Sequence, residues 1–317
     1  MEANDLDERG RRAVRPLDRV HRAERGQFFT PAPIAQYMAS LLEAPVSNAE
    51  PIRLLDPGAG IGSLTAAVAQ RLWPHRMEAT CYEAEPRFLD DLGLTLAGLP
   101  EVVGRIEARD FIAHAAELVR AGSEPAYTHA ILNPPYKKIG RSAPARQHLR
   151  ALGFETSNLY AGFLACTIAL CRPGAQMVAI LPRSFMNGLY FKPFRRWLLA
   201  RVAISQINVF DRRDSAFSGD QVLQENVILK VVVGGRQEQV RVTAFRDASL
   251  TEMCRRLCAF SEIVSPGDAE HFIHIPGATS QQRQGGSILS ELGLDISTGP
   301  VVDFRLRDHL RMQPEPG

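Results

Sequence analysis

The chain has 317 residues, with 37 Lys and Arg against 35 Asp and Glu, and 45% of its residues are hydrophobic. This length fits one large α/β domain with a small appendage, and the ordinary apolar fraction excludes a wholly disordered or fibrous protein. No apolar run approaches the roughly 20 residues of a membrane span and the N-terminus lacks a signal-peptide core, so we expect a cytoplasmic protein without a membrane partner, whose five scattered cysteines stay reduced.

Apolar periodicity alternates between the helical and the extended pattern along most of the chain. In chain order it predicts a helix over 34–42, a strand over 52–55, a helix over 64–73, a strand over 79–82, a helix over 87–96, a strand at 106, a strand over 130–132, a helix over 159–170, a strand over 177–181, a helix that ends with residues 197–201, and strands over 204–210, 227–233 and 240–245. This alternation is typical of a mostly parallel sheet with helices on both faces. Gly234-Gly235 predicts that the last two strands form a hairpin. Cys254, Leu257 and Cys258 predict the buried face of a helix, and we expect no metal site.

A glycine-rich turn follows the strand predicted over 52–55. Gly58, Gly60 and Gly62 permit a tight turn and leave space where a Cβ would block a ligand. Asp56 stands just before the first glycine, where its carboxylate would repel a pyrophosphate and attract a cation. S-adenosylmethionine carries an ammonium and a sulfonium group, so it is the cofactor that this turn predicts.

Two further acids follow the next two strands. Glu83 comes about twenty residues after the glycines, at the distance expected for an acid that binds ribose hydroxyls. Asp110 follows the strand at 106 and is suited to accept from an adenine amino group. Open α/β sheets bind ligands at the carboxyl ends of their strands, so these acids predict one cofactor site.

The tetrapeptide Asn133-Pro134-Pro135-Tyr136 follows the strand predicted over 130–132. The two prolines restrict the backbone, so the Asn133 side-chain oxygen and the Pro134 carbonyl become a rigid pair of acceptors. Hydrogen bonds to both acceptors would favour a pyramidal geometry at a planar amine and free its lone pair. Tyr136 offers a ring on which a flat substrate can stack, which contributes about 1–3 kcal/mol per base.

Taken in chain order, these motifs resemble the gamma-class N6-adenine DNA methyltransferases of bacterial restriction–modification systems. The resemblance covers about residues 26–245 and rests on Phe28-Phe29-Thr30-Pro31, Asp56-Pro57-Gly58-Ala59-Gly60, Glu83, Asp110 and Asn133-Pro134-Pro135-Tyr136. It implies a Rossmann-like class I methyltransferase fold, with a mostly parallel seven-stranded sheet and a late antiparallel strand. It also implies methyl transfer from S-adenosylmethionine to adenine N6 in double-stranded DNA by direct displacement, after the base is flipped out of the helix.

The same resemblance assigns roles to individual residues of this chain. Cofactor binding falls to Thr30, Asp56, Gly58, Gly60, Glu83, Asp110 and Phe111. The catalytic grip on the base falls to Asn133, Pro134, Pro135 and Tyr136, and Phe217 would stack on the other face of that base. The stretch from Lys137 to Arg150 has five basic residues and no acid, and we predict that Lys137, Lys138 and Arg141 contact the DNA backbone.

We predict three segments: a polar arginine-rich arm over 1–25, the catalytic domain over 26–250, and a C-terminal extension over 251–317. The extension would be the root of a target-recognition domain, or a separate specificity polypeptide would supply recognition. Two alternatives remain at this stage. In the first, the same methyl transfer acts on an RNA base or on a protein glutamine amide instead of DNA. In the second, the chain is a catalytically silent DNA-binding subunit.

Overall fold

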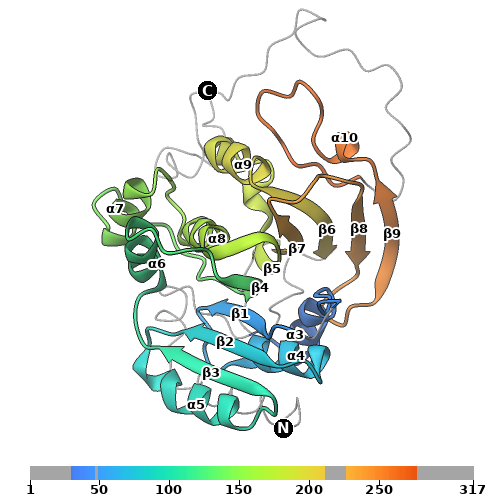
Figure 1. Cartoon of the computed structure of the whole chain (residues 1–317). Coiled ribbons are helices and arrows are strands. Elements are labelled where there is room, and N and C mark those ends of the chain that lie inside the picture. The colour runs from blue at the N-terminus through green and yellow to red at the C-terminus, as the bar shows by residue number, and fades with distance from the viewer. Residues whose placement is uncertain (1–29, 47–48, 211–225, 277–317) are drawn as a thin grey trace, which may run out of the picture. The chain divides into compact units, whose positions relative to one another are not determined.

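The computed structural model in Figure 1 describes residues 30–46, 49–210 and 226–276, and a nine-stranded sheet runs through them. The strands are β1 (Ile52–Pro57), β2 (Met77–Tyr82), β3 (Val102–Glu107), β4 (Tyr127–Leu132), β5 (Cys171–Pro182), β6 (Val202–Phe210), β7 (Asn226–Val233), β8 (Val240–Phe245) and β9 (Glu252–Cys258). The helices are α3 (Ala32–Ser40), α4 (Ser63–Leu72), α5 (Leu89–Ala97), α6 (Phe111–Arg120), α7 (Pro144–Ala151), α8 (Leu159–Leu170), α9 (Lys192–Leu199) and α10 (Phe260–Ile263). No helix in these ranges is long and apolar enough to cross a lipid bilayer.

The strand order β3-β2-β1-β4-β5-β7-β6-β8-β9 confirms the expected class of fold. Strands β3, β2, β1, β4 and β5 are all parallel, and β7 lies antiparallel between β5 and β6. The expected count of seven strands is wrong. β8 extends the sheet by pairing parallel with β6, and β9 then pairs antiparallel with β8.

The predicted hairpin between residues 227–233 and 240–245 is also wrong, although both strands are present. They do not pair, because β6 lies between them. Residues 234–239 are long enough to cross the end of β6, and Gln237 holds them there. Its side chain accepts a hydrogen bond from the Ile204 N–H at 2.8 Å and donates one to the Ile204 carbonyl at 2.9 Å. The late antiparallel hairpin is β8 with β9 instead.

Residues 254–258 form part of strand β9 and not the predicted helix. A spacing of four residues places Cys254 and Cys258 on one side of a strand as well as on one face of a helix, so the spacing alone could not decide. Cys258 is fully buried. Leu257, which a helix would have buried, lies on the opposite face of the strand and is 61% exposed.

Helices pack on both faces of the sheet (Figure 1). Helices α3, α4 and α5 contribute to one hydrophobic core, and α6 to α9 contribute to the other. Because β1, β2 and β4 are parallel, their carboxyl ends meet at the same edge. The glycine turn, Glu83 and Asn133 therefore all emerge at that edge.

Candidate active site

The glycine turn after β1 is anchored on the end of β2. The N–H groups of Gly58 and Ala59 donate to the Tyr82 carbonyl at 2.9 and 2.8 Å. Gly60 has a φ of +57°, and a Cβ at that position would meet no protein atom within 4 Å. The turn therefore borders open space at Gly60, as expected of a loop against which a ligand lies.

Glu83 ties this turn to the chain that follows β2. One of its carboxylate oxygens accepts from the Gly60 N–H at 2.8 Å, and the other accepts from the Glu85 N–H at 2.8 Å. The side chain is buried, and burial raises the pKa of Glu83 while these N–H donors act to lower it. Each carboxylate oxygen has a further lone pair, so the group can still accept from the hydroxyls of a ribose.

Asp56 is fully buried at the end of β1. Its Oδ2 accepts from the Thr65 hydroxyl at 2.7 Å, whereas its Oδ1 has no hydrogen-bond partner among the described residues. Burial raises the pKa of Asp56 to about 7 against the lowering effect of the Thr65 hydrogen bond. A buried carboxylate with one orphan oxygen is what a cationic ligand group would stabilise.

Asp110 and Phe111 begin α6, at the end of the segment that follows β3. Asp110 is the N-cap residue, and its side chain accepts from the Ala113 N–H at 2.7 Å. It is exposed, so its carboxylate is also accessible to a ligand. Phe111 is only 2% exposed and packs between Tyr82 and Phe163, with ring centroids at 4.9 and 5.2 Å.

The Asn133–Tyr136 tetrapeptide is held from two sides. The Asn133 amide nitrogen donates to the Thr30 hydroxyl at 3.0 Å, so the amide oxygen lies on the side away from Thr30. The Tyr136 hydroxyl donates to the Ile180 carbonyl of β5 at 3.1 Å. Pro134 is buried, and Pro135 is half-buried. Thr30, at the start of α3, is thus in direct contact with the predicted catalytic residue.

The loop after Tyr136 carries the exposed cations of this region. Backbone hydrogen bonds join residues 137–139 to residues 157–159, which fixes the start of the loop. Arg146 and Arg150 form ion pairs with Glu155, just beyond the acid-free stretch. Among the described residues no ion pair involves the other three cations, which are the predicted DNA contacts Lys137, Lys138 and Arg141.

Several predicted features lie outside the described residues. These are Phe217, the arginine-rich arm over 1–25, Phe28-Phe29, and the part of the C-terminal extension after residue 276. Their predicted roles stay predictions.

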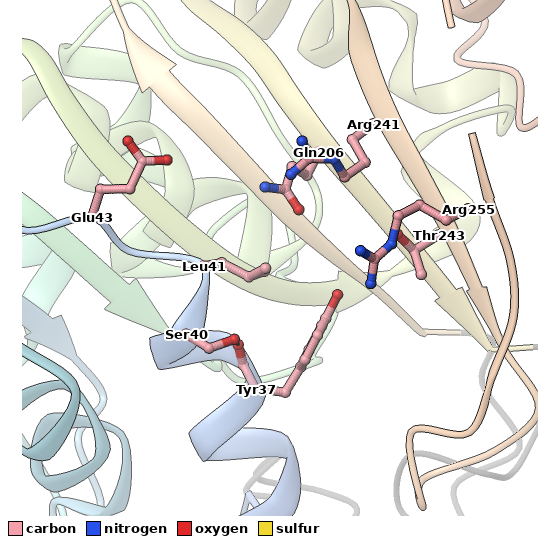
Figure 2. Close-up of a pocket in the computed structure, with 8 residues that line it drawn as sticks. All are labelled: Tyr37, Ser40, Leu41, Glu43, Gln206, Arg241, Thr243 and Arg255. Atoms are coloured by element: carbon pink, nitrogen blue, oxygen red, sulfur yellow. The ribbon is translucent and has the colours of Figure 1, made fainter. Parts of the chain in front are cut away.

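A separate polar pocket of about 250 Å³ lies between the end of α3 and the strands β6, β8 and β9 (Figure 2). The guanidinium group of Arg255 points toward the Tyr37 ring in this pocket. The residues that line it are Tyr37, Ser40, Leu41, Glu43, Gln206, Arg241, Thr243 and Arg255. None of them belongs to the glycine turn or the tetrapeptide, so this pocket is distinct from the predicted active site.

Sequence reasoning missed three residues that support the site. Thr65 holds Asp56, Phe163 packs under Phe111 and lies 3.6 Å from where a Cβ of Gly58 would be, and the Tyr160 ring meets that of Tyr136 at 6.3 Å. Thr65 lies nine residues after Asp56. Because the helix after a glycine turn folds back over the preceding strand, this spacing could have predicted the contact between Thr65 and Asp56. The two aromatic residues lie in the segment 158–163, which also resembles the family, but the resemblance assigned them no role at the site.

Sequence comparisons bear on the same motifs. The family described as "Eco57I restriction-modification methylase" matches residues 105–217, a range that includes the tetrapeptide. The chain is 40% identical to the type II methyltransferase M.BsuBI of Bacillus subtilis, over 98% of this chain and 65% of that protein. It is 37% identical to M.PstI of Providencia stuartii, over 94% of this chain and 62% of that protein. The chain thus spans less than two thirds of the length of these relatives.

Comparison with solved structures supports the fold. A modification subunit of a putative type I restriction enzyme from Vibrio vulnificus has a TM-score of 0.62 at 14% identity, over 86% of this chain and 64% of that one. A putative class I S-adenosylmethionine-dependent methyltransferase from Listeria monocytogenes has a TM-score of 0.58 at 16% identity, over 79% and 78%. At these identities the likeness shows the class I methyltransferase fold alone.

Proposed function

We propose that the chain transfers a methyl group from S-adenosylmethionine to N6 of adenine in double-stranded DNA. Its similarity to the restriction–modification methylase family and to two type II methyltransferases supports this proposal. One observation carries this proposal. The Asn133–Tyr136 tetrapeptide is pinned, through Thr30 and through the Ile180 carbonyl, at the sheet edge that also bears the glycine turn.

The residues at this edge fit the cofactor. Gly60 leaves open space beside the turn, Glu83 presents carboxylate lone pairs to ribose hydroxyls, and the orphan oxygen of Asp56 suits the ammonium of the methionine portion. Asp110 would accept from the adenine amino group, and Phe111 would border its ring. When bound, S-adenosylmethionine supplies an electrophilic methyl carbon on a sulfonium.

The protein's own part in the reaction is to position the nucleophile. The Asn133 amide oxygen and the Pro134 carbonyl would accept hydrogen bonds from the two N–H groups of adenine N6 and direct its lone pair toward the methyl carbon. The Thr30 hydrogen bond keeps the Asn133 oxygen pointing away from α3. The Tyr136 ring would hold one face of the base, because its hydroxyl is anchored on β5. Such positioning contributes about 7–11 kcal/mol in favourable cases, so a single displacement needs no covalent enzyme intermediate.

An adenine inside a duplex cannot reach this edge, so the base would be flipped out. Lys137, Lys138 and Arg141 come soon after Tyr136 and form no ion pair with the residues that the structure describes; they would bind the phosphates on either side of the flipped base. Phe217 would cover the second face of the base. Recognition of a particular sequence would come from residues outside the described ranges or from a separate polypeptide, and the reaction would take place in the cytoplasm.

The test is methyl transfer with labelled S-adenosylmethionine and three substrates offered together: unmethylated genomic DNA, total RNA and a protein extract. We expect label in DNA alone, and sequencing of modified bases should then locate the methylated adenines within a short recognition sequence. Label in RNA or protein would move the proposal to an RNA base or a glutamine amide. If calorimetry detects no cofactor binding, the chain is a silent DNA-binding subunit.

A further inference from the structure

The turn between β5 and α9 exposes two large apolar side chains side by side. Leu189 is 72% exposed and Tyr190 is 94% exposed. The other large apolar side chains of the same turn are buried, with exposures of 0% for Phe185, 2% for Met186 and 9% for Phe191. The turn therefore has its own core and directs only two apolar residues outward. Paired exposure of this kind marks an interaction site more often than a lone surface leucine does.

The turn is rigid because a fully buried arginine holds it. The Arg195 guanidinium donates to the carbonyls of Phe185 at 3.0 Å and Gly188 at 2.7 Å, and to the Glu270 carbonyl at 2.8 and 3.0 Å. Gly188 makes the turn tight, because a Cβ there would lie 2.6 Å from the Ser184 carbonyl oxygen. Leu189 and Tyr190 are thus presented on a fixed support.

This support stands next to the predicted base site. The turn follows Pro182, two residues after Ile180, whose carbonyl accepts the Tyr136 hydroxyl hydrogen bond. The Tyr160 ring lies between the two features, with its centroid 6.3 Å from that of Tyr136 and 5.8 Å from that of Phe191. The rings of Tyr136, Tyr160 and Phe191 therefore form a continuous row. It connects the predicted base-stacking residue, Tyr136, to the turn that presents Leu189 and Tyr190.

The charge of this segment fits a nucleic acid. From residue 183 to residue 201 the chain has five basic residues and no acid: Arg183, Lys192, Arg195, Arg196 and Arg201. Arg195 is buried and Lys192 pairs with Glu270, so the exposed cations of this segment are Arg196 and Arg201. The exposed Lys137 and Lys138 leave the same edge of the sheet from β4. Apolar side chains on a basic support are the means by which proteins unstack base steps, at a cost of a few kcal/mol per step.

We propose that Leu189 and Tyr190 form a wedge that enters duplex DNA beside the target adenine and keeps the opened base pair apart. This inference rests on the proposed function. The wedge stabilises the flipped state by occupying the space from which the base has left, and it takes no part in the displacement at N6. Its removal should therefore matter for a paired adenine and much less for one that is already unpaired.

The experiment compares the full chain with the Leu189→Ala/Tyr190→Ala double variant. Both residues are exposed, so the variant should keep its fold, which circular dichroism and thermal unfolding verify. Leu94→Ala on α5 is the matched control, because Leu94 is 65% exposed at a distance from the site. The substrates are two duplexes with the recognition sequence found by methylation mapping. In one the target adenine faces thymine, and in the other it faces an abasic position.

We expect the double variant to lose about tenfold or more in kcat/KM on the paired duplex and less than threefold on the abasic duplex, with Leu94→Ala unchanged on both. 2-Aminopurine at the target position should also show a weaker fluorescence increase with the double variant. Equal losses on the two duplexes, or no loss on either, would overturn the wedge while the wild-type activity upholds the proposed function. Unchanged methylation together with a changed oligomeric state by light scattering would assign the pair to a protein contact and overturn it as well. If the wild type methylates no DNA, the proposed function fails and the wedge fails with it.

Discussion

Asp56 should make the stability of the cofactor-free protein depend on pH between 4 and 8. Replacement of Asp56 by Asn should remove that contribution. In the wild type, Asp56 is fully buried and only its Oδ2 has a partner, the Thr65 hydroxyl. Burial raises its pKa from 3.8 to about 7. The folded state therefore binds a proton that the unfolded state has already released across that interval.

The magnitude follows from the two pKa values. Stability from the protonated carboxyl is fully present below about pH 4 and is lost as the pH rises through 7, because the folded-state pKa is the higher of the two. A tenfold change in the ionisation equilibrium corresponds to about 1.4 kcal/mol, so ionisation of Asp56 should cost the fold about 4 kcal/mol between pH 4 and pH 8. Asn keeps an acceptor for Thr65 and cannot ionise.

The assay is urea unfolding of both proteins at pH 5, 6, 7 and 8 without cofactor. The difference between the two free energies of unfolding should change by about 2.6 kcal/mol from pH 5 to pH 8, in favour of Asp56→Asn. The pH dependence is the decisive quantity, because any constant cost of the Asn amide cancels from it. Parallel pH profiles would refute the reasoning and would mean that the carboxylate is not desolvated as the structure shows.

Cofactor binding should oppose this effect, because an ammonium beside the orphan oxygen favours the ionised carboxylate. S-adenosylmethionine should then bind wild type more tightly at pH 8 than at pH 6, and calorimetry in buffers of different ionisation enthalpy should detect proton release. Asp56→Ala should weaken the affinity for the cofactor more than it lowers turnover at saturating cofactor. A pH-independent affinity would show that the ammonium lies elsewhere.

The remaining predictions concern the base site, the basic loop and the buried arginine. Asn133→Ala should abolish turnover and leave the cofactor dissociation constant within about tenfold, since each hydrogen bond to the nucleophile acts in the chemical step; a large loss of cofactor binding by calorimetry would contradict this role. Replacement of three loop cations by Gln should lower the slope of log K for DNA against log salt by about 2.7, at about 0.9 per phosphate contact. The loop variant combines changes at Lys137, Lys138 and Arg141. Arg76→Gln, an exposed arginine just before β2, is the control with an unchanged slope. Arg195→Met should cost about 2–5 kcal/mol in urea unfolding, because it removes the donor of the Phe185 and Glu270 carbonyls. A loss under 1 kcal/mol would show that the turn does not depend on the guanidinium.

Sequence periodicity predicted α3 to α5 and β1 to β4 from local patterns, but it missed α6 and α7. Helix α4 and strands β1 and β2 lie within a few residues of their predicted ends, where proline or glycine interrupts the pattern. Pairing in the second half depends on contacts that no local pattern carries. Residues 227–233 and 240–245 have the composition of a hairpin, yet β6 lies between them and pairs with both. Gln237 in the connection bonds the Ile204 backbone of β6.

The site shows the same division between local and distant information. Each motif could be assigned to a strand end from the sequence, since a parallel sheet brings all such ends to one edge. The contact that orients the predicted catalytic amide could not, because Thr30 and Asn133 are 103 positions apart and a hydroxyl in a Thr-Pro helix start has an ordinary capping role. The structure joins the start of α3 to the end of β4, so the helix that precedes the glycine turn supports the base site directly. We therefore expect that Thr30→Val, which removes the hydroxyl and keeps the shape, lowers turnover more than cofactor affinity. If turnover and cofactor affinity fall by the same factor, Thr30 acts on the cofactor alone and does not orient Asn133.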